Sequence, residues 1–242
     1  MSGDDVTIGR VLTRRRALAL LGAAGIGGSR LLAPSAARAQ GPASPGLCVV
    51  RPALTEGPYF VDVKLDRSDI RADPADGTRR PGAPLAITLR VSRLAGGACA
   101  PLPGAIVDVW HCDAAGVYSD VADPHGGTVG HRFLRGFQTT DAGGLVTFTT
   151  IYPGAYPGRA VHVHFKVRTA PNAGRGHEFT SQLFFDDALT DQVHARPPYP
   201  GGARTRNTRD GIYRRAGGRL TMPVAPSGGG YAGSFDLALE IG

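Results

Sequence analysis

Short runs of alternating apolar and polar residues, separated by turns rich in glycine and proline, recur along most of this chain. Such alternation is typical of β-strands that place one face on a core. The clearest runs are 85–91, 105–110, 133–139, 145–151, 160–167, 181–185 and 231–241. No stretch shows a convincing helical period, so the sequence predicts an all-β fold with a single β-sandwich domain. The runs at 133–139 and 145–151, joined by a turn at 141–144, are expected to pair as a hairpin.

Residues 1–39 are expected to be an export signal rather than part of the fold. Arg14, Arg15 and Arg16 precede an apolar run at 19–26, and Ala37-Arg38-Ala39 fits a cleavage site, although retention of the signal also stays open. The arginines resemble a twin-arginine signal, which predicts a periplasmic or secreted protein that meets the membrane only during export. The apolar run is shorter than the roughly 20 residues that a membrane-spanning helix needs. Residues 40–242 are therefore expected to form the folded domain.

The net charge of +7 is concentrated near the start of the chain. Residues 1–39 hold six Arg and two Asp, whereas the remainder has 21 Lys and Arg against 18 Asp and Glu. No dense basic run or basic patch interleaved with aromatic residues follows, so no nucleic-acid partner is expected.

The chain has three cysteines, Cys48, Cys99 and Cys112. In an oxidising compartment one pair can form a disulfide and leave the third thiol free. Cys48 and Cys99 lie in loop-like sequence and are the favoured pair, while the other pairings stay open. Cys112 is not accompanied by a CxxC motif or a complete Cys/His ligand set, which argues against a structural zinc site.

The stretch 152–165, YPGAYPGRAVHVHF, carries the strongest chemical signal. His162 and His164 are two residues apart, so in a strand both side chains project from the same face. Tyr156 lies in a turn stiffened by two Pro-Gly pairs, and Tyr118 follows an upstream strand and turn. Phenolate is a hard anionic donor, and because a free tyrosine has a pKa of about 10, only a strongly Lewis-acidic ion holds it deprotonated at neutral pH. The pattern therefore favours Fe(III) over Zn(II).

Further motifs flank these four residues. They are Glu56-Gly57-Pro58-Tyr59, Pro103 to Trp110, Gly116 to Tyr118, Phe133 to Gly136, Asp141 to Gly144, Thr150 to Pro157 and Arg159 to Phe165. In this order and spacing, they resemble the intradiol ring-cleavage dioxygenases, the group that contains catechol 1,2-dioxygenase and protocatechuate 3,4-dioxygenase. The resemblance covers Leu54 to Phe185, whereas the helical N-terminal dimerisation segment of the cytoplasmic catechol dioxygenases has no counterpart. The chain resembles the shorter, exported members more than the cytoplasmic ones.

The resemblance implies roles for eight residues. Four of them would bind Fe(III), namely Tyr118, Tyr156, His162 and His164. Tyr156 would also act in catalysis, because the substrate displaces it and it can then take a proton. Arg159 would stabilise negative charge on the substrate, and Gln182 would hydrogen-bond close by. Tyr59 and Trp110 would line the substrate pocket, although core packing explains Trp110 equally well.

The implied function is an oxidoreductase of aromatic-compound catabolism. Such an enzyme inserts both atoms of O2 between the two hydroxylated carbons of a catechol-type substrate and yields a cis,cis-muconate-type diacid. A non-catalytic β-sandwich binding module with the same fold is the alternative. A zinc hydrolase built on the two histidines lacks a carboxylate ligand at a fitting spacing. The resemblance assigns neither the particular catechol nor the oligomeric state, and His111, His125 and His131 are expected in loops or at the surface.

Overall fold

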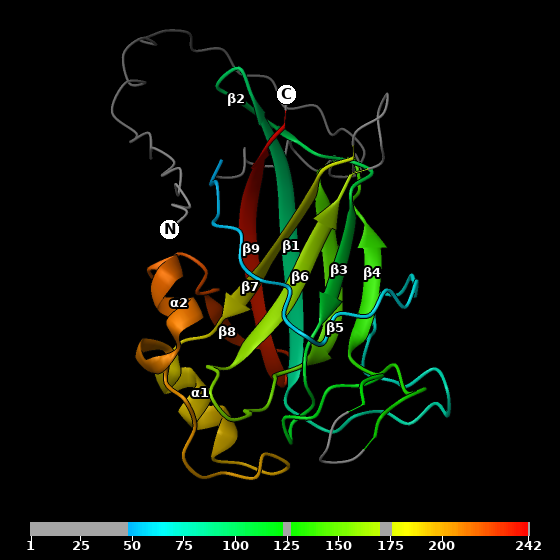
Figure 1. The fold of residues 1–242 in the computed structure, drawn as a ribbon, viewed down its shortest axis with the longest axis vertical. Helices are drawn as coiled ribbons and strands as arrows, with labels where there is room; N and C mark the ends of the chain where they lie inside the picture. Colours follow the sequence, from blue (N-terminus) through cyan, green and yellow to red (C-terminus); the bar gives the residue numbers. More distant parts are fainter. Residues whose placement is uncertain (1–47, 123–126, 170–175, 242) are drawn as a thin grey trace, which may run out of the picture. The chain divides into compact units, whose positions relative to one another are not determined.

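The strands of the protein form two sheets (Figure 1). The computed structural model describes residues 48–122, 127–169 and 176–241. In the five-stranded sheet the order is β2-β1-β9-β8, with β5 paired to β1. Its strands are β1 (Pro84–Ala95), β2 (Ala98–Pro101), β5 (Leu145–Ile151), β8 (Val224–Ser227) and β9 (Gly230–Glu240). The pair β1 and β9 is parallel, and the other pairs are antiparallel.

The four-stranded sheet has the order β4-β3-β6-β7, and all of its pairs are antiparallel. Its strands are β3 (Ile106–Trp110), β4 (Arg135–Thr139), β6 (His162–Arg168) and β7 (Glu178–Phe184). Two sheets with few helices confirm the predicted all-β class. Each of the seven predicted strands overlaps an observed strand, while β2 and β8 were not predicted.

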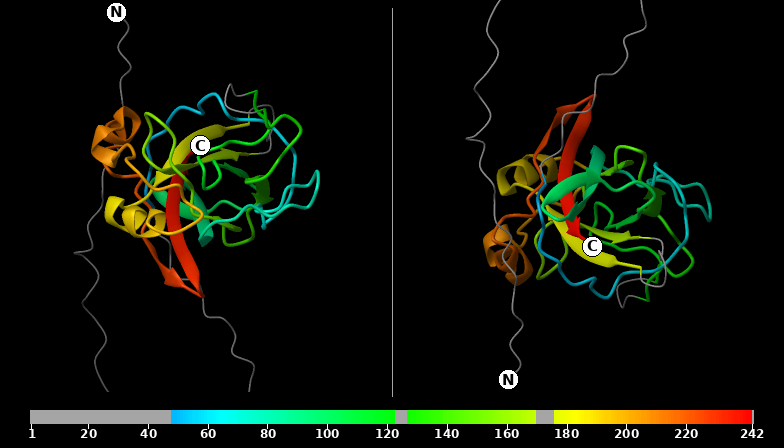
Figure 2. Two further views of the ribbon diagram at one scale, coloured as in Figure 1. Left: turned by 90° about the horizontal axis from the view of Figure 1, so that it is seen from below. Right: turned by 90° about the horizontal axis from the view of Figure 1, so that it is seen from above.

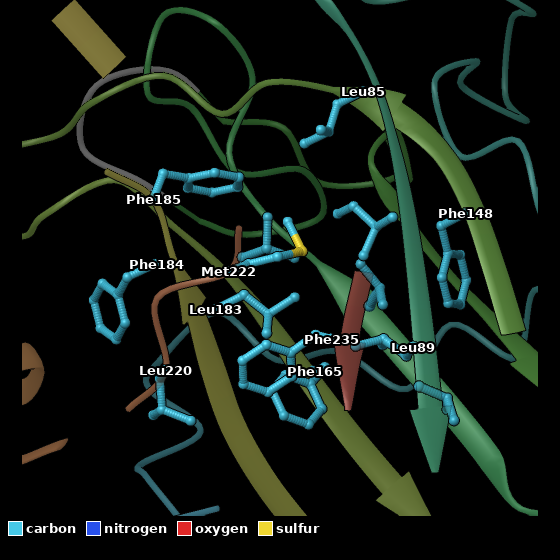
Figure 3. Close-up of a cluster of buried hydrophobic side chains, with 14 of the residues drawn as sticks. Leu85, Leu89, Phe148, Phe165, Leu183, Phe184, Phe185, Leu220, Met222 and Phe235 are labelled. Carbon is cyan, nitrogen blue, oxygen red and sulfur yellow. The ribbon is translucent and has the colours of Figure 1, made fainter. Parts of the chain in front are cut away.

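The two sheets face each other across one hydrophobic core (Figure 3). Leu85 and Leu89 of β1 point into it from one sheet, and Phe165 of β6 and Leu183 of β7 point into it from the other. On β6 the core therefore takes the odd-numbered positions, so the even-numbered side chains project from the opposite face of the sheet. Those side chains include the two predicted histidine ligands, His162 and His164.

The outer face of the four-stranded sheet is covered by residues 52–66, which we call the strap (the segment drawn blue to cyan in Figure 1). At one end Leu54 donates its backbone N–H to Thr180 of β7, and at the other Asp66 forms a β-bridge with Phe137 of β4. Between them the strap crosses β6 and β3. Because of this cover, β6 is buried on both faces.

The strap is held on β6 by Lys166. The Lys166 ammonium forms an ion pair with Glu56 and lies 4.0 Å from the ring centroid of Phe60. Such a cation–π contact adds to the ion pair when the cation is largely withdrawn from water. The Phe60 ring in turn packs against the edge of Trp110, with centroids 4.9 Å apart.

The predicted hairpin of β4 and β5 is wrong, because the two strands belong to different sheets. The turn itself forms, since Gly144 donates its N–H to the carbonyl oxygen of Asp141. However, Val91 of β1 donates to the carbonyl oxygen of Gly144 and draws the following strand onto β1. The local turn residues thus determine that the chain reverses direction after β4. The tertiary contact with β1 determines which strand β5 pairs with.

The expectation that the chain has no helix is also wrong. Helices α1 (Asp187–His194) and α2 (Gly211–Ala216) and the 3-10 turn η1 (Asn207–Arg209) follow β7. Asp186 and Asp210 are N-caps, and each accepts two backbone N–H groups of its helix. In both views of Figure 2 the helices lie together on one side of the sheets. Among the described residues, no helix has the length and apolar character needed to cross a membrane.

The favoured disulfide is confirmed: Cys48 is bonded to Cys99, and Cys112 is a buried free thiol. The bond joins the beginning of the described chain to β2. The predicted signal at 1–39 lies outside the described residues, so it stays a prediction, as does the domain boundary at 40.

Candidate metal centre

His162 and His164 present their Nε2 atoms to each other at a distance of 3.0 Å. Both side chains are buried. Burial lowers the pKa of His162 to about 3 and the pKa of His164 well below its usual range. The Nδ1 of His162 lies 2.6 Å from the carbonyl oxygen of Ala160, to which it can only donate. The Nε2 of His162 therefore carries a lone pair, as a metal ligand must.

Tyr156 and Tyr118 bring two phenols to the same point. The hydroxyl of Tyr156 is 3.3 Å from Nε2 of His162, and the rings of Tyr118 and Tyr156 have centroids 5.7 Å apart. The buried Tyr118 hydroxyl has no hydrogen-bond partner among the described residues. Buried polar groups almost always have one, so an orphaned hydroxyl beside two imidazoles fits a metal ligand.

This donor set fits a ferric ion better than zinc. Burial raises the pKa of Tyr156 to about 12 and the pKa of Tyr118 well above its usual range. Only a strongly Lewis-acidic cation would ionise such phenols at neutral pH. In the part of the chain that the structure describes, no three His, Cys, Asp or Glu side chains form a cluster able to hold a metal.

Two glycines allow the loops that carry the phenols to meet. A Cβ at Gly116 would lie 2.3 Å from the carbonyl oxygen of Ala155, and a Cβ at Gly154 would lie 2.4 Å from that of Ala114. The N–H of Gly154 donates to the carbonyl oxygen of Asp113. Backbone packs directly on backbone here, which is possible because glycine has no side chain.

Arg159 lies beside this cluster with all three guanidinium nitrogens engaged. Its Nη2 donates to Oε1 of Gln182, and its Nη1 lies 3.5 Å from Nε2 of His162. Its Nε donates to Oδ2 of Asp210 at 2.9 Å. Gln182 is held in turn by Thr55 of the strap, whose carbonyl oxygen accepts from its Nε2. The cation is thus fixed next to the converging donor atoms.

Tyr59 and Trp110 form aromatic walls of the centre. Tyr59 stacks on Tyr118, with ring centroids 4.4 Å apart, and Trp110 stacks on His164 at 4.9 Å. Arg135 anchors the strap here, because its Nη1 donates to the carbonyl oxygen of Tyr59. Both predicted pocket residues therefore touch predicted metal ligands.

Comparisons with known proteins show the family to which the chain belongs. A family model described as "Dioxygenase" matches residues 55–197. The solved structure of an intradiol ring-cleavage dioxygenase from Tetranychus urticae is 30% identical, with a TM-score of 0.69, and the match covers 80% of this chain and 95% of that one. The chain belongs to the intradiol dioxygenase family.

Two further dioxygenases are similar to this member of the intradiol dioxygenase family. The protocatechuate 3,4-dioxygenase beta chain of Burkholderia cepacia is 36% identical over 148 residues. That alignment spans 58% of this chain and only 58% of the curated relative's own length. The dioxygenase domain of a carbohydrate-binding fusion protein from Streptomyces sp. SirexAA-E is 34% identical, with a TM-score of 0.56, and the match covers 80% of this chain and 100% of that domain.

All eight predicted site residues lie within the segment that matches the family, and the structure brings them together. Sequence reasoning missed Asp210, which lies beyond that segment and contacts Arg159. The pattern of an Asp followed by a short amphipathic run could have indicated a helix N-terminus at this point. Nothing in the sequence pattern indicates that this N-terminus reaches Arg159, because the contact joins residues far apart in the chain.

His111 lies in the loop that follows β3, one of the two positions expected for it, but its side chain is fully buried rather than at the surface. Its Nδ1 lies 2.7 Å from the carbonyl oxygen of Cys112, and its Nε2 lies 2.7 Å from Oγ1 of Thr150. Donation to the carbonyl leaves Nε2 to accept from the hydroxyl, so the ring is neutral. His131 is partly exposed and pairs with Asp73, while His125 lies outside the described residues.

Proposed function

We propose that this member of the intradiol dioxygenase family is an Fe(III)-dependent enzyme that cleaves catechol-type substrates. It would insert both atoms of O2 between the two hydroxylated carbons and release a cis,cis-muconate-type diacid. The observation that carries this proposal is the convergence of the buried Tyr118 phenol, the partly buried Tyr156 phenol and two buried imidazoles. A binding module without iron would gain nothing from an orphaned Tyr118 hydroxyl, which is costly in a buried position.

Tyr118, Tyr156, His162 and His164 would hold the iron. Bound ferric iron would supply Lewis acidity, chelating both oxygens of the diol and making its ring reactive towards O2. The two imidazoles are neutral at all but strongly acidic pH, so they are ready to bind without first losing a proton.

Tyr156 would act as the base for the substrate. Burial raises the pKa of its hydroxyl to about 12, so the phenolate is a strong base whenever a metal does not stabilise it. Its Oη would therefore take a proton from one hydroxyl of the diol. Tyr118 is more deeply buried and stacks under Tyr59, which suits a ligand that stays in place.

Arg159 would stabilise negative charge that develops on the substrate. Its position beside Nε2 of His162 places a fixed cation next to the donor atoms. Gln182 would hold one end of the guanidinium in this orientation. Tyr59 and Trp110 would exclude water and pack against the flat ring of the substrate.

The proposal is tested by loading the protein with Fe(III) and measuring visible absorption and O2 consumption. Tyrosinate ligands should colour the protein burgundy. Catechol, protocatechuate and hydroxyquinol should be offered in parallel, with product absorbance recorded for each. A colourless protein that retains zinc in a 1:1 ratio and consumes no O2 with any of the three would overturn the proposal.

We also propose that the chain is exported through the twin-arginine route. The motif at Arg14 and Arg15 supports this, and the Cys48–Cys99 disulfide suits an oxidising compartment. Fractionation of cells that express the full chain should find it outside the cytoplasm. Replacing Arg14, Arg15 and Arg16 together by Lys should retain the chain in the cytoplasm, and unchanged export of that variant would contradict the proposal.

A further inference from the structure

Asp210 holds the guanidinium of Arg159 through its Nε. Oδ2 of Asp210 accepts from Nε of Arg159 at 2.9 Å, and this carboxylate is almost fully buried, with 1% of its side-chain surface exposed. Two nitrogens of Arg159 are thereby tethered, Nε to Asp210 and Nη2 to Gln182. A planar guanidinium held at two nitrogens has a fixed direction for the third. That third nitrogen, Nη1, points at Nε2 of His162.

The same carboxylate also holds the backbone that leads into the ligand strand. Oδ2 of Asp210 accepts from the N–H of Ala160 at 2.9 Å. The carbonyl oxygen of Ala160 accepts from Nδ1 of His162. Asp210 therefore acts on the His162 ring through one intervening residue as well as on Arg159.

The other oxygen of Asp210 caps helix α2. Oδ1 accepts from the N–H of Ile212 at 2.7 Å and from that of Tyr213 at 3.2 Å. A buried carboxylate is costly unless all of its acceptor positions are used, and here it accepts four hydrogen bonds. The helix N-terminus adds a favourable dipole. Both oxygens of the Asp210 carboxylate are thus used as hydrogen-bond acceptors.

We propose that Asp210 is a positioning residue that aims Arg159 and orients His162 for the reaction at the metal centre. This inference rests on the proposed dioxygenase function. It makes helix α2, which lies beyond the segment that matches the family, part of the catalytic unit. Asp210 touches neither the reacting atoms nor the metal ligands and acts through Arg159 and Ala160.

The test is a double-mutant cycle with Asp210→Asn and Arg159→Gln on the iron-loaded protein. Asn is as good an N-cap as Asp, so helix α2 is retained while the acceptor for Arg159 is lost. Asp210→Asn should lower kcat roughly 10- to 100-fold, as loss of a partner that orients the site does. It should change KM less than kcat. In the Arg159→Gln background, Asp210→Asn should have little further effect on kcat, because its action passes mainly through Arg159.

The matched control is Asp186→Asn. Asp186 caps helix α1 in the same way, by accepting from the N–H groups of Ala188 and Leu189, and it has no contact with Arg159. This variant should keep kcat. The inference is overturned if Asp210→Asn keeps the wild-type kcat, or if Asp186→Asn lowers kcat as much as Asp210→Asn does. It is also overturned if Asp210→Asn lowers kcat by the same factor in the Arg159→Gln background as in the wild-type protein.

A second measurement does not depend on activity. In protein loaded with Ga(III), a diamagnetic stand-in for Fe(III), the Nε–H of Arg159 should be protected from exchange with water and visible by NMR. Its signal is assigned by its loss in Arg159→Gln. Protection should persist in Asp186→Asn and disappear in Asp210→Asn. If the wild-type protein shows no dioxygenase activity, the proposed function fails, and this measurement alone decides whether Asp210 holds Arg159.

Discussion

Trp110 lies parallel to His164, with ring centroids 4.9 Å apart and 9° between the ring planes. The two residues are also paired across β3 and β6. The Nδ1 of His164 has no hydrogen-bond partner among the described residues. Metal-binding histidines usually rely on such a partner to fix the ring. Here the stacked indole of Trp110 fixes the orientation of the His164 ring instead.

Trp110→Leu should therefore weaken iron binding in addition to destabilising the fold, because Trp110 is also a large buried side chain. We expect loss of Fe(III) affinity of about 10-fold, the range for residues that orient a ligand. Trp110→Phe keeps an aromatic face and should lose less. Iron content after dialysis and the intensity of the visible band measure the effect, and equal iron retention in all three proteins would contradict it.

Tyr118→Phe should change the stability of the metal-free and iron-loaded proteins in opposite directions. Removing the orphaned hydroxyl should stabilise the metal-free protein by about 1 kcal/mol, because a buried polar group without a partner is costly. The same change removes a phenolate ligand, so iron affinity and the visible band should fall. Tyr156→Phe is the control, because the hydroxyl of Tyr156 contacts Nε2 of His162 and its loss should not stabilise the metal-free protein. Thermal unfolding with and without Fe(III) separates the two effects.

Gly154→Ala should disrupt the approach of the two phenol loops. Its Cβ would lie 2.4 Å from the carbonyl oxygen of Ala114, so the backbone must shift at a cost of about 1–3 kcal/mol. The visible band should weaken as Tyr156 moves away from Tyr118. Gly211→Ala is the control, because its Cβ would meet only the end of the Arg214 side chain, at 4.0 Å. Equal iron binding in both variants would show that the close approach is not needed.

His111 should make the fold sensitive to acid. Burial lowers its pKa to about 4 from a usual 6.5, so between these values the unfolded chain binds a proton that the native state does not. Its contribution to stability is complete above pH 6.5 and is lost as the pH falls towards 4. Between pH 7 and pH 5 the wild-type protein should lose about 2 kcal/mol more than His111→Gln. Urea unfolding at both pH values measures the difference, and parallel losses in the two proteins would refute this role.

Reduction of the Cys48–Cys99 disulfide should destabilise the fold and loosen the strap. The bond closes a loop between residues 51 apart in sequence, which corresponds to about 4 kcal/mol in the chain-entropy estimate. The strap begins shortly after Cys48, so activity should fall together with stability as Tyr59 separates from Tyr118. A Cys48→Ala/Cys99→Ala variant should be equally unstable and should not respond to reductant. An unchanged midpoint of urea unfolding on reduction would contradict the prediction.

Strands could be predicted from the sequence because alternation is a local property. The interval 145–151 was placed at its observed bounds, and β1 differed only at its ends. The partners of β4 and β5 could not be predicted, since the contact between Val91 and Gly144 joins distant residues. Helices α1 and α2 were missed because they are short and owe their stability to their caps and to packing against the sheets.

The residues of the candidate site could be predicted mainly because the sequence motifs around them resemble those of a known family. Nothing local distinguishes Tyr118 from an ordinary residue at the end of a strand, and only the joint pattern singled it out. Tyr59 of the strap was predicted only because its motif belongs to the family resemblance. Asp210 reaches the site through a tertiary contact that no sequence pattern indicates. The outward-facing histidines of β6 were predictable from strand periodicity alone.

The parallel pairing of β1 with β9 has a consequence for how the chain is made. Leu85 pairs with Tyr231, and Leu94 pairs with Glu240. Strand β1 is therefore synthesised long before its partner β9. Until Gly230–Glu240 has left the ribosome, one long edge of β1 has no partner, and an open edge invites pairing with other chains. Contacts so distant in sequence also favour slow folding. Newly made chains would therefore keep an aggregation-prone edge until synthesis is almost complete. A chain cut short by a frameshift or an early stop would keep that edge and aggregate.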